Sequence, residues 1–212
     1  TSANPQPFFV IEADESDGTL RQFQPEHALL LNIDAEHLDF YEGIESVCRE
    51  FIGFAAQTRG LKVYCQDDPH LAHALDGQPG AVSFGFHARS DYPVERPAPP
   101  PSPLGPSFAH WHRNPKLGDF TTLLLGEKNR SNAAAVIAFL HQLGFAPTDI
   151  ARALAPFRGA ARRQQLLHGD DQVLIYDDYG HHPNEIRATL RAFKHLGPRR
   201  LVVAFQPHRF TR

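Results

Sequence analysis

The sequence predicts an α/β fold whose core is a parallel sheet. Short, wholly apolar runs rich in β-branched residues alternate with amphipathic segments, as expected for buried parallel strands separated by helices. Several of these runs end in polar residues, and open α/β sheets place their ligands at the carboxyl ends of their strands. A length of 212 residues suits one large domain or two small ones.

The first half of the chain supplies most of the expected sheet. Its strands are short, uninterrupted apolar runs, at 8–11, 28–31, 61–64 and 81–86. Apolar residues at helical spacing predict a helix over 44–56. Asp68 followed by Pro69 predicts the start of a short second helix, because Asp is a good N-cap and Pro fits the first turn.

The middle of the chain departs from this alternation. A proline-rich stretch from 93 to 106 predicts irregular surface structure, with edge strands near 108–112 and 120–124. Beyond it, an alanine-rich segment over 133–140 predicts a closely packed helix that ends near Gly144.

A second, smaller part of the chain is expected after residue 158. The helix predicted over 147–154 is followed by Pro156 and Gly159, which end the regular structure, so we expect domains over 1–158 and 159–212. The second domain is expected to begin with a βαβ unit, its strand, helix and strand lying at 172–176, 183–195 and 201–205.

Composition excludes several classes of protein. The chain has 21 Lys and Arg against 24 Asp and Glu, a formal net charge of −3, so it carries no basic field that would attract nucleic acid. No apolar run approaches the roughly 20 residues that span a bilayer, so no membrane partner is expected. Cys48 and Cys65 are expected to be free thiols in a reducing cytoplasm. Because it contains no Met, we interpret the sequence as an internal piece of a longer protein.

Acidic residues and a histidine follow the first two expected strands. An acidic run begins at Glu12, directly after the first strand, and His37 lies among polar residues after the second. Mg²⁺ is bound by one or two carboxylates together with waters and phosphate oxygens, so Glu12 and His37 could share a metal site. A carboxylate with an imidazole also suits Zn²⁺ or Mn²⁺, and the spacing does not choose between these metals. The alternative is a solvated acidic loop.

Two asparagines form a third polar cluster, at the start of the alanine-rich helix. Side-chain amides both donate and accept hydrogen bonds, so Asn129 and Asn132 suit the edge of a purine ring. The alternative is simple N-capping, for which Asn is a favoured residue.

A fourth cluster follows the last two expected strands. Arginine holds carboxylates through paired hydrogen bonds, so arginines beside histidines predict a site for a small anionic substrate. The alternatives are a turn with a helix cap and a solvated strand end. The members of the cluster are Asp177, Asp178, His181, His182, His208, Arg209 and Arg212.

No phosphate-binding loop occurs in the sequence. Neither G-x-x-x-x-G-K-[ST] nor G-x-G-x-x-G is present, and Gly-Lys never occurs as a pair. If the protein uses ATP, we expect its phosphate loop upstream of Thr1. The 212-residue chain alone is then not expected to turn over ATP.

Six motifs, taken together and in this order, resemble those of the Mur ligases. They are EADESD at 12–17, NIDAEHLD at 32–39, NRSNAA at 129–134, GAARR at 159–163, DDYGHHP at 177–183 and FQPHRFTR at 205–212. The resemblance covers nearly the whole chain. It implies part of a parallel-sheet central ATPase domain, after its phosphate loop, followed by the start of a Rossmann-like C-terminal domain. Gln164-Gln165 departs from the Phe-Asp usual in the family.

Within this family the chain resembles the branch that joins L-alanine to UDP-N-acetylmuramate in peptidoglycan precursor synthesis. The resemblance implies ATP and Mg²⁺ as cofactors and a bacterial cytoplasmic enzyme. In the implied reaction the muramate carboxylate attacks the γ-phosphate of ATP to give an acyl phosphate, and the amine of L-alanine then displaces phosphate. The alternatives are a related ligase acting on a murein peptide, a non-catalytic binding module that kept the fold, and a metal hydrolase built on His37, His181 and His182.

The resemblance also implies a role for particular residues. Glu12 and His37 would bind Mg²⁺, and Asn129 and Asn132 would contact adenine. The residues implied to lie near the nucleotide phosphates and ribose are Arg163 or Arg162, and Asp178. The residues implied to receive L-alanine, with the arginines on its carboxylate, are His181, Arg209 and Arg212.

Overall fold

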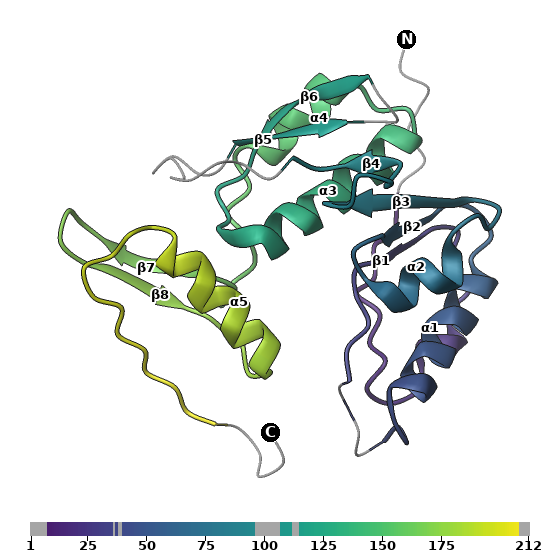
Figure 1. Cartoon of the computed structure of the whole chain (residues 1–212), viewed down its shortest axis with the longest axis horizontal. Coiled ribbons are helices and arrows are strands. Elements are labelled where there is room, and N and C mark those ends of the chain that lie inside the picture. Colours follow the sequence, from purple (N-terminus) through teal and green to yellow (C-terminus); the bar gives the residue numbers. More distant parts are fainter. Residues whose placement is uncertain (1–7, 36, 38–39, 96–106, 112–114, 208–212) are drawn as a thin grey trace.

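The computed structural model describes residues 8–35, 37, 40–95, 107–111 and 115–207, and a parallel sheet lies in its first part (Figure 1). The sheet has four strands, in the order β1 (Ala28–Leu30), β2 (Lys62–Cys65), β3 (Ala81–Gly85) and β4 (Tyr92–Pro93). All three strand pairs are parallel, with Val63 in register between Leu29 and Val82. The predicted α/β class and its parallel sheet are therefore confirmed.

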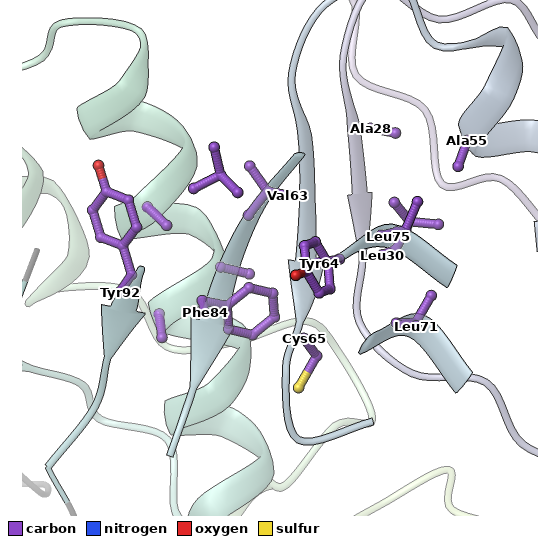
Figure 2. Packing of buried hydrophobic residues seen from close by; sticks show 14 of the residues in the cluster. Ala28, Leu30, Ala55, Val63, Tyr64, Cys65, Leu71, Leu75, Phe84 and Tyr92 are labelled. Carbon is purple, nitrogen blue, oxygen red and sulfur yellow. The ribbon is translucent and has the colours of Figure 1, made fainter. Parts of the chain in front are cut away.

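Two helices cover one side of this sheet (Figure 1). They are α1 (Ile44–Gln57), close to the bounds that the sequence predicts, and α2 (Pro69–Leu75), which starts where the sequence predicts. Leu71 and Leu75 of α2 are fully buried, and Figure 2 shows them next to Leu30. Burying a leucine side chain contributes about 1.5–3 kcal/mol relative to leaving it exposed, so these contacts hold α2 on the sheet.

Helix α3 (Gly126–Gln142) contacts β2 and β3 from the other side of the sheet (Figure 1). Small side chains let it approach closely, and they are buried along its middle turns: Ala133, Ala134, Ala135 and Ala138, together with Ile137. The alanine-rich segment thus forms the closely packed helix that the sequence predicts.

A hairpin and a short helix complete this part of the fold. β5 (Ser107–Trp111) pairs antiparallel with β6 (Lys116–Thr121), and α4 (Pro147–Leu154) contacts both β6 and α3. Strand β6 begins and ends earlier than the range of 120–124 that the sequence predicts. Most of the proline-rich stretch, 96–106, lies outside the described residues.

The last part of the described chain is a hairpin followed by a helix. β7 (Gln165–Gly169) and β8 (Leu174–Asp177) pair antiparallel, and α5 (Pro183–Lys194) contacts α3. On α5, Ala192 and Phe193 are buried. The Phe193 ring lies 4.6 Å, centroid to centroid, from that of Tyr176 on β8, which holds the helix against the hairpin.

Two predicted strands, 8–11 and 201–205, are not strands in the structure, and the predicted second βαβ unit is therefore wrong. Both segments are largely exposed: Val10 is 88% and Val202 72% accessible. An apolar run becomes a strand only when a neighbouring strand satisfies its backbone hydrogen bonds. Within the described ranges, β8 has only β7 as its neighbour, and β1 pairs on one edge only. β7 was missed because its sequence, QLLHG, lacks an apolar run or a clear alternation.

Two further sequence expectations can be compared with the structure. Cys48 and Cys65 are free thiols, as predicted, and burial raises the pKa of both. Across the described residues, no helix combines the length and the apolar character needed to cross a membrane.

Candidate functional site

The loop that follows β1 is anchored by a buried carboxylate. Asp68, the N-cap of α2, accepts hydrogen bonds from the backbone N–H groups of His70 and Leu71 at 3.0 and 2.9 Å. Its second oxygen accepts from the N–H of Ile33 at 2.8 Å, across 35 residues of sequence. The sequence predicts the cap but gives no sign of the second contact, which fixes the loop where the polar residues after β1 begin.

A cluster of potential metal ligands lies beside this loop. Within the described residues, Asp14, Glu15 and His37 form the group of three whose ligand atoms all lie within 4.8 Å of one another. The His37 imidazole is 3.8 Å from the Glu15 carboxylate, and His37 has the uncommon left-handed φ of 54°. The pKa of Asp14 is lowered, chiefly by hydrogen bonds from Ser16, so its carboxylate is ionised at neutral pH.

This cluster agrees only in part with the metal ligands named above. Two carboxylates and an imidazole suit a divalent cation that keeps water or phosphate oxygens as its other ligands, so the donor set fits Mg²⁺ or Mn²⁺. His37 belongs to the cluster, whereas Glu12 is exposed and is not one of its members. The ligand role of Glu12 stays a prediction.

The asparagines of the third cluster lie inside α3 rather than before it. The N-cap of α3 is Leu125, which makes no side-chain capping hydrogen bond, so the simple capping alternative is wrong. The Asn129 amide nitrogen donates to the Leu125 carbonyl at 2.8 Å and to Gln164 Oε1 at 3.0 Å. Asn132, one turn further on, is exposed. Both residues can therefore be reached from solvent, Asn129 from a half-buried position.

The segment between α4 and β8 brings the paired arginines to one aromatic ring. The guanidinium carbons of Arg162 and Arg163 lie 5.0 and 5.7 Å from the centroid of the Tyr179 ring. The Arg163 guanidinium also lies 3.4 Å from the Glu185 carboxylate. Burial raises the pKa of Glu185, but hydrogen bonds from the backbone N–H groups of His181 and His182, together with the charge of Arg163, outweigh this effect. The pKa of Glu185 is therefore lowered overall. The arginines thus stand beside the start of α5.

Asp178 shapes the turn that leads into α5. Its two oxygens accept hydrogen bonds from the backbone N–H of Gln164 at 2.9 Å and of Gly180 at 2.8 Å. The turn-and-cap alternative for Asp177-Asp178 is therefore right about the turn and wrong about the cap, because the N-cap of α5 is His182. His182 and Glu185 form a capping box there, with a histidine in the place that Ser or Thr usually takes, which is why the usual sequence signature is absent.

The start of α5 also touches the loop after β1. The Asn184 side-chain amide donates to Asp34 at 2.6 Å, and the His182 ring is 3.9 Å from the same carboxylate. Partial burial raises the pKa of Asp34, but the hydrogen bonds from Asn184 and the Ala35 N–H, with the nearby charge of His182, lower it overall. The polar residues that follow β1 and the fourth cluster of the sequence therefore meet.

Not every candidate residue can be placed in this region. His208, Arg209 and Arg212 lie outside the described residues. His181 is half-buried, with its ring 5.2 Å from that of Tyr179. Among the described residues, neither His181 nor His182 belongs to the group of potential metal ligands around His37, so the geometry gives no support to the metal hydrolase alternative.

The comparisons with known protein sequences agree on one family. The family model described as the Mur ligase middle domain matches residues 3–140, and the one described as the Mur ligase, glutamate ligase domain matches residues 162–210. The chain is 38% identical over 208 residues to a UDP-N-acetylmuramate--L-alanine ligase of Geotalea daltonii. It is 42% identical over 210 residues to one of Sorangium cellulosum. These alignments cover 97% and 96% of this chain but only 45% and 44% of those proteins.

Solved structures give the same answer. The chain resembles UDP-N-acetylmuramate-alanine ligase MurC from Thermotoga maritima with a TM-score of 0.74 and 27% identity, over 86% of this chain and 41% of that one. It resembles MurF from Acinetobacter baumannii with a TM-score of 0.70 and 25% identity, over 86% of this chain and 40% of that one. The chain spans less than half the length of these relatives. Because the middle-domain model alone matches well over half of its residues, the chain belongs to the Mur ligase family.

Proposed function

We propose that the whole protein joins L-alanine to UDP-N-acetylmuramate, using ATP and Mg²⁺. The observation that carries the proposal is the 37–42% identity, over nearly all of the chain, to curated proteins named for that ligase. No observation favours the murein peptide ligase or the binding module over it. The named relatives are bacterial, and we place the protein in the bacterial cytoplasm, where ATP is available.

The proposed division of the chain into two domains agrees with the two family-model matches. Residues 1–158 form the central ATP-binding domain, and 159–212 begin the C-terminal domain, a boundary that falls between the matches over 3–140 and 162–210. In the described part, the polar loops of both parts meet through Asp34 and Asn184. This contact supports a site shared between the two domains.

The nucleotide is assigned to the region around the start of α3. Asn129 and Asn132 contact the adenine, Arg163 lies near the phosphates, and Asp178 lies near the ribose. The position of Arg163 beside Tyr179 and Glu185 supports its assignment, because these contacts hold an otherwise exposed side chain at one place.

The metal is assigned to His37 with the acidic run that begins at Glu12. Asp14 and Glu15, whose carboxylates lie close to His37, are further candidate ligands. When bound, Mg²⁺ offsets the charge repulsion between the nucleotide phosphates and an attacking carboxylate.

L-alanine is assigned to His181, Arg209 and Arg212. Paired hydrogen bonds from arginine to its carboxylate would leave its amine free and directed at the acyl phosphate. The half-buried position of His181 at the start of α5 supports its assignment to this substrate.

The test is phosphate release by the whole protein. With ATP, Mg²⁺ and UDP-N-acetylmuramate, release should require L-alanine. Arg209→Ala should raise the KM for L-alanine sharply, whereas Arg199→Ala, an exposed arginine with no assigned role, should not. Release that requires a murein peptide instead, or no release with any combination of substrates, would refute the proposal.

A further inference from the structure

Gln164 connects the two halves of the proposed nucleotide site. Its backbone N–H donates to Asp178 at 2.9 Å, and its side-chain oxygen accepts from the Leu125 N–H at 3.2 Å and the Asn129 amide at 3.0 Å. Its φ of 48° lies in the left-handed region, which is uncommon for a residue with a side chain. Three hydrogen bonds to two other segments hold this backbone in place.

Backbone partners fix the orientation of both side-chain amides in this network. The Leu125 carbonyl can only accept, so the Asn129 atom 2.8 Å from it is the NH₂ nitrogen. The Leu125 N–H can only donate, so the Gln164 atom that faces it is the oxygen. Neither amide can be flipped without setting two donors or two acceptors against each other.

These bonds leave the side-chain oxygen of Asn129, Oδ1, as the polar atom available to a ligand. Both hydrogens of its NH₂ group are used, one by Leu125 and one by Gln164. Within the described part of the chain no donor reaches its Oδ1. Asn129 therefore presents a fixed acceptor to a ligand, although a free asparagine side chain could present either group.

A fixed acceptor distinguishes purine bases by the group at carbon 6. Adenine carries an amino group there, which donates to an acceptor, whereas hypoxanthine carries a carbonyl oxygen, which repels one. We propose that Gln164 is a positioning residue that locks the Asn129 amide and thereby makes the site selective for 6-aminopurine nucleotides. The inference rests on the proposed function, because it takes Asn129 to be the adenine contact.

The experiment measures binding of ATP and of inosine triphosphate to the whole protein by calorimetry, with Mg²⁺ present. The dissociation constant of ATP should be at least about tenfold lower than that of inosine triphosphate. This is the difference expected when one hydrogen bond is replaced by an unpaired acceptor. Gln164→Leu removes the acceptor that locks Asn129 and should bring the ratio of the two dissociation constants close to one. Gln164→Glu keeps an oxygen at that position and should restore most of the ratio.

Two more variants separate positioning from folding. Gln164→Asn tolerates the left-handed backbone but is one methylene too short to reach Asn129, so it should lose selectivity while it stays folded. Gln172→Leu makes the same chemical change as Gln164→Leu at an exposed turn, and it should leave the ratio unchanged. In the ligand-free protein, the NMR signals of the Asn129 NH₂ group should shift in Gln164→Leu and Gln164→Asn, and not in Gln172→Leu.

Each outcome is decisive. ATP and inosine triphosphate bound equally by the unaltered protein would overturn the inference and leave the proposed ligase activity standing. Selectivity that survives in both Gln164→Leu and Gln164→Asn, or an Asn129 signal that does not respond to them, would also overturn it. Binding of neither nucleotide would overturn this inference together with the proposed use of ATP.

Discussion

The side-chain amide of Asn184 donates a hydrogen bond to the carboxylate of Asp34 at 2.6 Å, although 150 residues separate them. The contact joins the loop after β1 to the first turn of α5, and so links the two parts of the chain that the family models match separately. The His182 ring also lies 3.9 Å from the same carboxylate.

We expect this contact to couple the two parts energetically. In a double-mutant cycle followed by urea unfolding, the free energy of unfolding should fall in both Asp34→Ala and Asn184→Ala. The loss in the double variant should be about 1 kcal/mol smaller than the sum of the two single losses. Asp171 is an exposed residue of the β7–β8 turn, so Asp34→Ala with Asp171→Ala should be additive and serves as the control. Additivity of the first pair would show that the contact contributes nothing.

The coupling should also depend on pH. Because the pKa of Asp34 is lowered in the folded chain, its contribution is fully present above the unfolded pKa near 3.8. It is lost as the pH falls below this value, through the folded pKa. The coupling energy should therefore be constant from pH 5 to pH 7 and shrink below pH 4. A coupling energy that grows on acidification would contradict the assignment.

The buried carboxylate of Asp68 is expected to stabilise both helix α2 and the loop that follows β1. Asp68→Ala removes the N-cap of α2 and leaves the Ile33 N–H without its acceptor, which should lower the free energy of unfolding by about 1–3 kcal/mol. Hydrogen exchange should also rise in the loop that follows β1. Asp171→Ala, an exposed aspartate in the β7–β8 turn, should change neither. Unaltered exchange at Ile33 in Asp68→Ala would refute the anchoring role.

Local patterns predicted the elements of the first part well, because each has a signal of its own. Helix α1 shows apolar residues at helical spacing, and α2 shows an Asp-Pro start, so the bounds of α1 and the start of α2 agree closely with the prediction. Strands β1, β2 and β3 of the parallel sheet are apolar runs with neighbours on the sheet, whereas the two-residue strand β4 has no such run and was not predicted. In such elements, local sequence and long-range packing favour the same structure.

The failures share a different cause. The runs at 8–11 and 201–205 have the composition of strands, yet among the described residues no strand pairs with either. The contacts of Gln164 and Asn184 cross large sequence separations and leave no local pattern. Sequence reasoning therefore identified polar clusters at strand ends and helix starts, and it could not say which side chains within them touch.

The alanine face of α3 should tolerate no added volume. Ala134 is fully buried against the sheet, so Ala134→Leu should force the helix away and lower stability by about 1–3 kcal/mol. Val136, two residues further on, is 42% exposed, and Val136→Leu should be nearly neutral. The two variants are compared by urea unfolding, with one m-value, the slope of the unfolding free energy against urea concentration, fitted to both curves. Equal effects of the two substitutions would mean that α3 is not packed as described.

Metal binding distinguishes the two sets of candidate ligands. Titration with Mn²⁺, followed by electron paramagnetic resonance, should show weaker binding by the whole protein carrying His37→Ala. If Asp14 and Glu15 complete the site, as their closeness to His37 suggests, Asp14→Ala should weaken binding and Glu12→Ala should not. The reverse result would identify Glu12 as the ligand. Unaltered binding in His37→Ala would exclude the site altogether.

Exposed apolar segments should dominate the behaviour of the 212-residue chain in solution. Val202 and Phe205 are 72% and 55% exposed, and the neighbouring β7–β8 hairpin also exposes leucine and isoleucine side chains. Such a surface binds hydrophobic dyes and favours association. The chain should therefore enhance the fluorescence of anilinonaphthalene sulfonate and self-associate in sedimentation experiments. Val202→Lys with Phe205→Lys should reduce both effects, whereas the same number of lysines placed at Arg199 and Arg200, which are already basic, should not. Weak dye binding by a monomeric chain would show that these side chains are covered in solution.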